Sequence, residues 1–321
     1  MGWKDKIVKS KFLIPIIIFF LIFGFIKIYP DKNISSCKNI YYKGTYELSE
    51  DLLYPLKNDY CIKINGNDIT LDCKGHLIKA SSMSCFLDGI GGVCGAGAIR
   101  AQGKNITIKN CLIENMTKED QKYTFFQYAL LVEDANKVLI ENNTFISDNF
   151  ITSFGFRNSD NVTFLNNKVN GADITFYNSN YGLVENNEFG NNSFSYIKEF
   201  RSKILISKSK NTIVTNNTIR NGIGAFELYA SENSVIYSNE IDNFSIGFIV
   251  INSTNDKIIQ NKISNTNVSL YLPSSDTYNN LILENTNLNV TCIAGYKLLG
   301  ENDTITIRTS PYAISHAKCY L

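Results

Sequence analysis

A short motif that ends in two asparagines recurs along this chain at a nearly constant spacing. The second Asn of the six clearest copies lies at positions 143, 167, 187, 217, 239 and 261, so the intervals are 24, 20, 30, 22 and 22 residues. A period near 22 residues with occasional insertions is typical of a repeat architecture. Fainter copies precede and follow these six. The copies are "ITIKNCLI" (106–113), "VLIENNTF" (138–145), "VTFLNNKV" (162–169), "GLVENNEF" (182–189), "TIVTNNTI" (212–219), "SVIYSNEI" (234–241), "DKIIQNKI" (256–263) and "LILENTNL" (281–288).

Each repeat reads as a group of short strands. Apolar and polar residues alternate with period two in the motif and in the runs between copies, such as "ILISKS" and "FIVINS". No stretch after residue 30 keeps an apolar period of 3.6 residues. A unit of about 22 residues cannot bury its apolar side chains alone, but it can when stacked on its neighbours. The sequence therefore predicts an all-β solenoid of about ten coils.

The paired asparagines fit the corners of such a coil. A tight corner needs a residue that tolerates the left-handed backbone conformation, and Asn does so best after Gly. Identical Asn side chains stacked from coil to coil can also form a hydrogen-bonded ladder. We expect this turn and ladder role for the Asn columns; a ligand-binding row is the alternative.

The N-terminus carries one strongly apolar run, residues 12–26, with four lysines before it and Lys27 after it. Extended to residues 12–29, the run approaches the length of a transmembrane helix. The flank "FIKIYPDKN" offers no small-x-small cleavage site, so we favour an uncleaved signal anchor over a cleaved signal peptide or a buried helix. The basic flank predicts a cytoplasmic tail at residues 1–11 and an extracytoplasmic body at residues 30–321.

An extracytoplasmic body changes the interpretation of several residue types. Eight cysteines without a Cys-x-x-Cys pair and only two histidines predict disulfides and no zinc site. Twelve Asn-x-Ser/Thr sequons occur, of which we expect a subset to be glycosylated. With 31 basic and 30 acidic groups, the chain has no basic stripe that would favour nucleic acid as a partner.

The segment at residues 37–79 resembles the N-terminal segment of right-handed parallel β-helix proteins of the pectin-lyase-like superfamily, especially those of archaeal and bacterial cell surfaces. The matching residues are Cys37, Gly44, Thr45, Tyr46, Cys61, Thr70, Leu71, Asp72, Gly75 and His76. The Asn-Asn repeats resemble those of the same group, so the likeness extends over about residues 37–290. It implies a right-handed parallel β-helix. It is weak for function, because this fold carries lyases, hydrolases, epimerases and inert surface proteins.

Four disulfides follow as expectations. The resemblance and the spacing both suggest Cys37–Cys61. A short Gly-rich step separates Cys85 from Cys94, and Cys292 and Cys319 are alone in the C-terminal third. This leaves Cys73 and Cys111, which end similar strands at about the same corner; neighbouring coils about 4.8 Å apart would permit a bond. Cys37–Cys73 or Cys61–Cys111 bonds would contradict this scheme.

Catalysis on a β-helix would need carboxylates that converge on one exposed face. One solvent-side column, aligned on the Asn-Asn motif, contains no acids in adjacent coils, and Glu133 beside Arg157 indicates an ion pair. Asp72 and His76 resemble turn-forming residues of the superfamily's N-terminal segment. Asp173 and Glu227 fall within strands and form no pair in the sequence. The column holds Glu133, Arg157, Tyr177, Ser207, Tyr229 and Ile251.

Weak catalytic candidates are therefore Asp72, His76, Glu133 and Arg157, and weak ligand-binding candidates are Tyr177 and Tyr229, whose rings could stack on sugars. The sequence favours a membrane-anchored cell-surface β-helix with a binding or structural role and polysaccharide as a candidate ligand. The alternative is a polysaccharide lyase or glycoside hydrolase that acts on surface glycans. No cofactor or metal is expected, except Ca²⁺ if the protein is a lyase.

Overall fold

A computed structural model describes residues 32–54, 59–82, 97–117, 127–147, 152–190, 202–272, 280–283, 285–286, 290–292 and 304–306. The chain divides into two compact units, Met1–Lys32 and Asn33–Leu321. Within the described ranges, no helix is long and apolar enough to cross a membrane. The proposed anchor at residues 12–29 and the tail at residues 1–11 lie outside these ranges.

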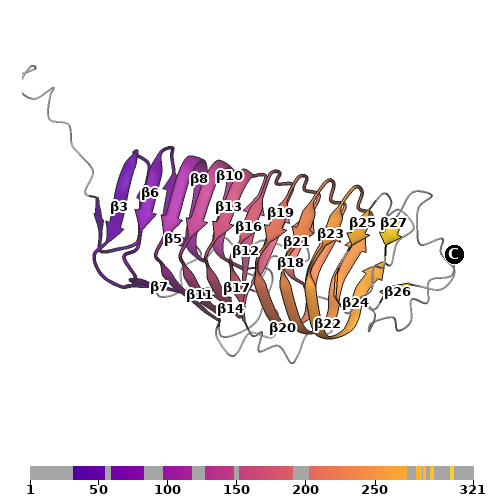
Figure 1. Cartoon of the computed structure of the whole chain (residues 1–321). Helices are drawn as coiled ribbons and strands as arrows, with labels where there is room; N and C mark the ends of the chain where they lie inside the picture. The colour runs from indigo at the N-terminus through magenta and orange to yellow at the C-terminus, as the bar shows by residue number, and fades with distance from the viewer. Residues whose placement is uncertain are drawn as a thin grey trace, which may run out of the picture. The chain divides into compact units, whose positions relative to one another are not determined.

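The second unit is a stack of coils in which every strand pairs in parallel with strands about one repeat away (Figure 1). Each coil passes through three faces, here named sheets 1, 2 and 3. Sheet 1 begins with β2 (Lys38–Ile40), β5 (Tyr60–Asn65) and the first parts of β8 (Gly97–Lys109) and β10 (Gln127–Glu141). It continues with β12 (Thr152–Arg157), β15 (Asp173–Tyr177) and β18 (Ser202–Ser207). The last parts of β20 (Thr218–Tyr229), β22 (Glu240–Ile251) and β24 (Lys262–Leu272) follow, and β26 (Val290–Cys292) completes the sheet.

Sheet 2 follows in each coil. It consists of β1 (Asn33–Ile34), β3 (Gly44–Leu48), β6 (Ile69–Asp72), the ends of β8 and β10, β13 (Asp160–Leu165), β16 (Leu183–Glu185), β19 (Ile213–Thr215), β21 (Val235–Tyr237), β23 (Lys257–Ile259), β25 (Leu281–Leu283) and β27 (Thr304–Thr306). Sheet 3 consists of β4 (Leu52–Tyr54), β7 (Leu77–Ser82), β9 (Leu112–Thr117), β11 (Thr144–Ser147), β14 (Lys168–Asn170), β17 (Glu188–Phe189) and the starts of β20, β22 and β24.

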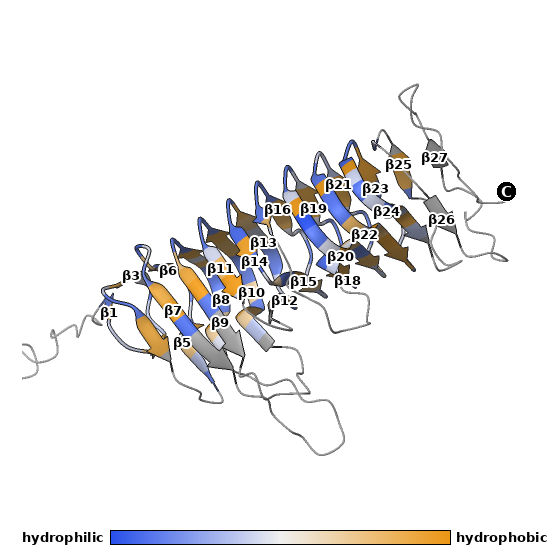
Figure 2. Cartoon of the chain, turned by 90° about the horizontal axis from the view of Figure 1, so that it is seen from below, coloured by the Kyte–Doolittle hydropathy of each residue, from blue (hydrophilic) through white to orange (hydrophobic). Residues whose placement is uncertain are grey.

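The core is built from columns of identical positions in successive coils. Apolar residues alternate with polar ones along the strands, which Figure 2 shows as orange and blue bands. In sheet 1, Phe156 and Phe176 occupy neighbouring coils, with ring centroids 4.6 Å apart and no exposed surface. Because each inward side chain meets its equivalent one coil away, the whole stack shares one continuous apolar core.

The predicted Asn column is confirmed at the corner between sheets 2 and 3. From Asn167 to Asn261, each buried Asn of the motif accepts a hydrogen bond from the backbone N–H and from the side-chain Nδ2 of the Asn one coil earlier; for Asn187 and Asn217 both distances are 2.9 Å. The column begins with the Cys111 N–H, which donates to Asn143, and ends with Asn285. The ladder residues are Asn143, Asn167, Asn187, Asn217, Asn239, Asn261 and Asn285.

The two asparagines of the motif have different structural roles. The first one carries the left-handed backbone, for example at Asn166 with φ of 53°, and it is exposed. The second is buried and forms the ladder. Ser238 and Gln260 replace the first Asn in later coils and keep the same backbone conformation. The turn and ladder roles expected of one column thus belong to two adjacent positions.

A second buried ladder lies at the corner between sheets 1 and 2 and is made of serines. The Ser159 N–H donates to the Ser179 hydroxyl at 3.0 Å, and the Ser179 N–H donates to the Ser209 hydroxyl at 3.0 Å. The Ser231 N–H likewise donates to the Ser253 hydroxyl. These contacts satisfy backbone donors that a corner would otherwise leave unpaired.

Two predicted disulfides are present. Cys37 bonds to Cys61 and Cys73 bonds to Cys111, with Cα–Cα distances of 4.6 and 4.7 Å. The second bond joins adjacent coils at the corner where Cys111 stands in the Asn column. Cys85, Cys94 and Cys319 lie outside the described residues, so the Cys85–Cys94 and Cys292–Cys319 bonds stay predictions.

Candidate functional site

The outer face of sheet 1 gathers most of the candidate residues. The strand register confirms the predicted solvent-side column, because Glu133 pairs with Arg157 and Arg157 with Tyr177. The column continues through Ser207, Tyr229 and Ile251. A ligand that lies along this column meets equivalent positions of successive coils.

An ion cluster occupies one end of this face. The Glu133 carboxylate accepts a hydrogen bond of 2.7 Å from Arg100 Nη2, and Arg157 Nη1 lies 3.9 Å from its other oxygen. The sequence suggested an ion pair between Glu133 and Arg157, and this contact is the longer of the two that Glu133 makes with arginines. The side chain of Glu133 is 17% exposed, whereas that of Arg157 is 46% exposed. Arg157 thus keeps donors directed to solvent, since a guanidinium has five.

Two tyrosines border the ion cluster, and glycines make room for them. A Cβ at Gly155 would lie 2.5 Å from the ring of Tyr128, and a Cβ at Gly97 would lie 2.8 Å from the ring of Tyr60. Burial raises the pKa of both phenols. Among the described residues, the Tyr60 hydroxyl and Arg100 Nε are buried without a hydrogen-bond partner. Unpaired buried donors cost folding free energy.

Tyr177 and Tyr229 stand farther along the same column and are 39% and 38% exposed. Ser207 separates them, so the two phenols are two strand spacings apart, about 10 Å. Lys208 Nζ lies 5.4 Å from the centroid of the Tyr177 ring and 3.4 Å from its hydroxyl. This cation–π contact holds one ring in place while part of its surface stays open.

A second group of ionisable residues on sheet 1 was missed as a group by sequence reasoning. Asp173 and Lys203 occupy one column in neighbouring coils, and Glu227 lies in the next outward column. Lys203 is 1% exposed and donates to the Gly190 carbonyl at 3.0 Å. Burial lowers the pKa of Lys203 to about 8, against an opposing effect of Asp173. Burial raises the pKa of Glu227, and the Ser202 hydroxyl partly offsets this.

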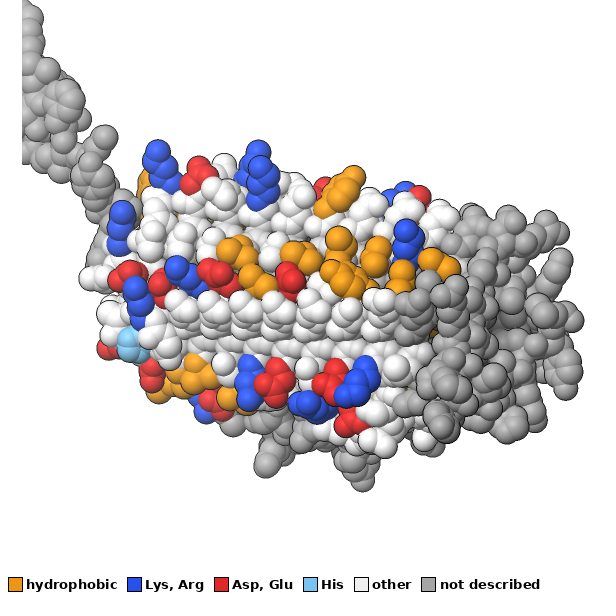
Figure 3. Space-filling view, in the orientation of Figure 1, with side chains coloured by type: hydrophobic (Ala, Val, Ile, Leu, Met, Phe, Trp, Pro, Cys, Tyr) orange, Lys and Arg blue, Asp and Glu red, His pale blue; other side chains and the backbone are white. Residues whose placement is uncertain are grey.

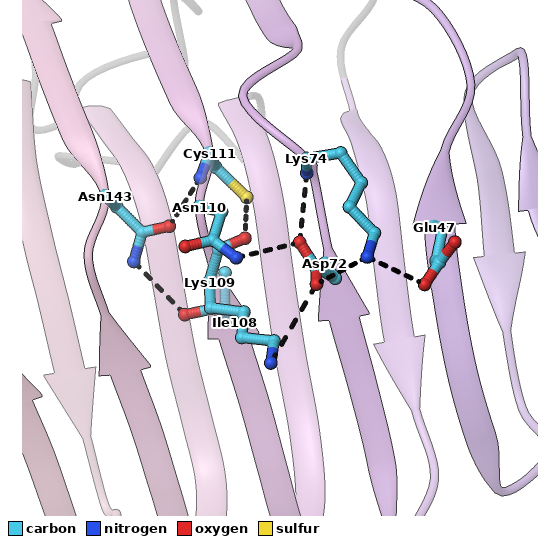
Figure 4. A network of polar contacts seen from close by, with 8 residues as sticks. All are labelled: Glu47, Asp72, Lys74, Ile108, Lys109, Asn110, Cys111 and Asn143. Atoms are coloured by element: carbon cyan, nitrogen blue, oxygen red, sulfur yellow. Dashed lines mark hydrogen bonds and ion pairs between the residues drawn. The ribbon is translucent and has the colours of Figure 1, made fainter.

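Asp72 and His76 lie elsewhere, at the corner between sheets 2 and 3. The Asp72 carboxylate accepts hydrogen bonds of 3.0 Å from the Lys74 N–H and from Asn110 Nδ2 (Figure 4). Burial tends to raise the pKa of Asp72, but these hydrogen bonds outweigh it and hold the pKa below its ordinary value. His76 Nδ1 lies 3.2 Å from an Asp51 oxygen. Both residues hold a turn, and the structure does not bring them to sheet 1.

The signal for the missed residues was present in the strand alignment. The run "SKILIS" aligns with "ADITFY", which places Lys203 opposite Asp173 once the coils are stacked. Arg100 belongs to a coil in which Cys111 replaces the marker Asn, so its column was harder to assign. No group of three or more His, Cys, Asp or Glu side chains in the described part of the chain is arranged to hold a metal ion.

A match to a protein-family model identifies the fold. Residues 56–198 and 170–310 match the family model described as "Right handed beta helix region". No curated protein sequence matches the chain. Among solved structures, the chain is similar to the enzymatically active domain of tailspike protein 2 of bacteriophage CBA120, with a TM-score of 0.48 and 12% identity over 71% of this chain and 38% of that chain.

Two other solved structures show a comparable likeness. For the periplasmic alginate epimerase AlgG, the TM-score is 0.45 and the identity 14%, over 79% of this chain and 76% of that chain. For DFA-IIIase from Arthrobacter chlorophenolicus, the TM-score is 0.48 and the identity 14%, over 79% and 69%. The chain spans about two fifths of the tailspike domain's length. These likenesses concern the course of the backbone only. Since the family model covers most of the repeats and the strands form parallel coils, the chain belongs to the right-handed β-helix family.

Proposed function

We propose that the protein binds a polysaccharide along the outer face of sheet 1. The observation that carries the proposal is the single column in which Glu133, Arg157, Tyr177 and Tyr229 follow one another along the stack. A linear polymer laid along the stack meets this column once per coil, at intervals of about 4.8 Å. One sugar chain can therefore contact charged and aromatic groups in turn.

The side chains of this column suit a sugar ligand. A half-exposed Tyr ring offers an apolar surface to the C–H groups of a sugar ring, and its hydroxyl offers a hydrogen bond. Paired strands fix the backbone at Tyr177 and Tyr229, so binding does not have to order the backbone there. The open donors of Arg157 can bind hydroxyl or carboxylate oxygens.

The test is a glycan-array screen of the full-length protein, scored for both binding and cleavage, followed by titration of the best ligand. Tyr177→Ala and Tyr229→Ala should each weaken binding about tenfold, which corresponds to about 1.4 kcal/mol. Tyr41→Ala is the matched control, since Tyr41 is 54% exposed at the N-terminal end of the stack. Equal affinities for all three variants would contradict the proposal.

A second candidate function is cleavage of a polysaccharide on the same face, by a lyase or a glycoside hydrolase. Support comes from Glu227, whose raised pKa suits a general acid, and from Lys203, whose lowered pKa suits a base. Against it, Lys203 is almost fully buried. Release of shorter oligosaccharides by the wild-type protein, abolished by Glu227→Gln with the fold retained, would favour this function over simple binding.

The location of the protein belongs to the same proposal. The apolar run at residues 12–29, with its lysine-rich flank, supports a single-pass anchor that leaves residues 30–321 outside the cytoplasm. An extracytoplasmic body is the setting in which disulfides such as Cys37–Cys61 persist. Surface glycans would then be the accessible class of ligand.

A further inference from the structure

The outer face of sheet 2 carries an exposed apolar stripe. Its residues, named here the apolar face, are Leu183, Ile213, Val235, Tyr237 and Ile259. Ile213 is 41% exposed and Tyr237 is 37% exposed. In Figure 3 the stripe appears as a band of orange side chains beside the white corner. Leu165 and Leu281 continue it at the two ends.

This stripe is confined to one part of sheet 2. The same two outward columns hold Thr70 and Asp72 in an earlier coil and Thr107 and Lys109 in the next. A sheet face that meets water normally carries polar residues at its outward positions, as these earlier coils do. An exposed apolar patch bordered by polar residues marks an interaction surface.

Two unpaired charges flank the apolar face. Glu185 ends β16 on one side, and Lys257 begins β23 on the other. Neither side chain has an ion-pair partner among the described residues. Three strand spacings, about 14 Å, separate β16 from β23, so these two charges cannot reach each other within one chain.

We propose that the apolar face binds the apolar face of a second copy of this chain, with the two stacks antiparallel. The two-fold axis runs along the strand direction, between β19 and β21, in the plane between the two faces. Ile213 then meets Val235 and Tyr237 of the second copy. The strand β16 of each copy faces β23 of the other, which brings the long side chains of Glu185 and Lys257 within reach of each other across the interface at both ends.

Charge decides between this arrangement and the parallel one. In a parallel dimer each strand would face its own equivalent, so Glu185 would approach Glu185 and Lys257 would approach Lys257. Like charges juxtaposed across an interface are unfavourable, whereas the antiparallel dimer contains two opposite-charge contacts. The second copy is therefore a self-complementary partner, as a two-fold interface requires.

The size of the apolar face sets the strength of the association. Six strands from β13 to β25, each contributing about three residues, give a footprint of roughly 300–400 Å² per copy. Stable complexes bury about 800 Å² per partner. The dimer is accordingly weak and reversible, and it forms at high local concentration, such as that of many copies on one surface.

The experiment is sedimentation velocity of the full-length protein over a wide concentration range, in a buffer with mild non-ionic detergent because residues 12–29 are apolar. The wild-type protein should show a reversible monomer–dimer equilibrium. Ile213→Glu should raise the dissociation constant at least about tenfold, which is about 1.4 kcal/mol. Ile146→Glu is the matched control, since Ile146 is 40% exposed but lies on sheet 3, and it should leave the constant unchanged.

Charge reversal tests the arrangement. Glu185→Lys and Lys257→Glu should each weaken the dimer, and the double variant should restore the dissociation constant to within about threefold of the wild type. A protein that stays monomeric at every concentration overturns the proposal. A dimer that ignores Ile213→Glu, or a double variant weaker than both single ones, overturns it as well.

Discussion

Replacing Asp256 by Asn should make the protein more stable near neutral pH. Asp256 is 1% exposed at the corner between sheets 1 and 2. Its carboxylate accepts hydrogen bonds from the Ser231 hydroxyl at 2.5 Å and from the Ser234 N–H at 2.7 Å. Other ladder serines, such as Ser179, donate instead to the carbonyl two residues earlier. Two hydrogen bonds do not fully replace the water that a buried carboxylate loses.

Burial raises the pKa of Asp256 from 3.8 to about 6, although the Ser231 and Ser234 hydrogen bonds oppose the shift. Between these two pH values the folded protein binds more protons than the unfolded chain. Stability is then greatest below about pH 4, falls as the pH rises towards 6, and is level above that. A difference of about two pKa units corresponds to about 3 kcal/mol.

An Asn at this position keeps an acceptor for the Ser234 N–H and offers Nδ2 as a donor to the Ser231 oxygen, without a charge to bury. Asp256→Asn should therefore gain up to about 3 kcal/mol at pH 7 and almost nothing at pH 4. Native-state hydrogen exchange in β21 and β23, measured from pH 4 to 8, reports the local opening free energy.

The control is Asp242→Asn, because hydrogen bonds from Ser264 and Asn265 lower the pKa of Asp242. Folding favours the ionised form of Asp242, so that variant should be less stable than the wild type by a constant amount above about pH 4, and the difference should shrink as the pH falls below that. A wild-type protein whose stability rises from pH 4 to 7 around Asp256, or an Asp256→Asn variant that keeps the wild-type pH slope, would refute the reasoning.

Three other predictions concern the ladder, a disulfide and the anchor. Asn217→Ala removes the acceptor of the Asn187 N–H and the Nδ2 hydrogen bonds to the Val184 and Thr215 carbonyls, so it should cost about 3 kcal/mol or more in chemical denaturation, whereas exposed Asn216→Ala should cost about 1. Replacing both Cys73 and Cys111 by Ala should cost about 2–5 kcal/mol by the same assay, and a loss below about 0.5 would contradict the disulfide's role. Deleting residues 1–30 should move the protein from the membrane to the soluble fraction of its host; membrane association that survives the deletion would show that residues 12–29 are not the anchor.

The repeat made most of the fold predictable. Because a β-helix core is a sum of nearest-neighbour contacts, one motif aligned on Asn217 fixes the inward and outward positions of every coil that shares it. This alignment correctly predicted that Glu133, Arg157 and Tyr177 occupy one outward column. The Cys73–Cys111 bond followed from the same logic, since stacking places equivalent corners about 4.8 Å apart.

The site was less predictable because coils differ in length between the motifs. In the sequence, the positions in sheet 1 were assigned by counting residues backward from the Asn-Asn motif. This count no longer matches the pairing of neighbouring strands before a β-bulge, such as the one at Tyr128 and Leu130 of β10. Arg100, which binds Glu133 more closely than Arg157 does, lies beyond such a bulge. Burial was also hidden: nothing in the sequence marks Lys203 as a buried amine, because its surroundings come from other coils.

The three faces of the stack carry different kinds of residue, and this limits where a ligand can bind. The buried Asn and Ser columns at the corners already form hydrogen bonds within the stack: the Asn187 N–H donates to Asn217, and the Ser179 N–H donates to Ser209. The outer face of sheet 2 is apolar around Ile213 and fits a protein partner better than a hydrated sugar. Sheet 1 alone, among the described outer faces, combines half-exposed aromatic rings with a cluster of two arginines and a carboxylate. The proposed polysaccharide binding and the proposed self-association therefore use different faces, so a dimer through sheet 2 would leave the sheet 1 column of both copies open to a shared glycan and would gain affinity through two linked sites.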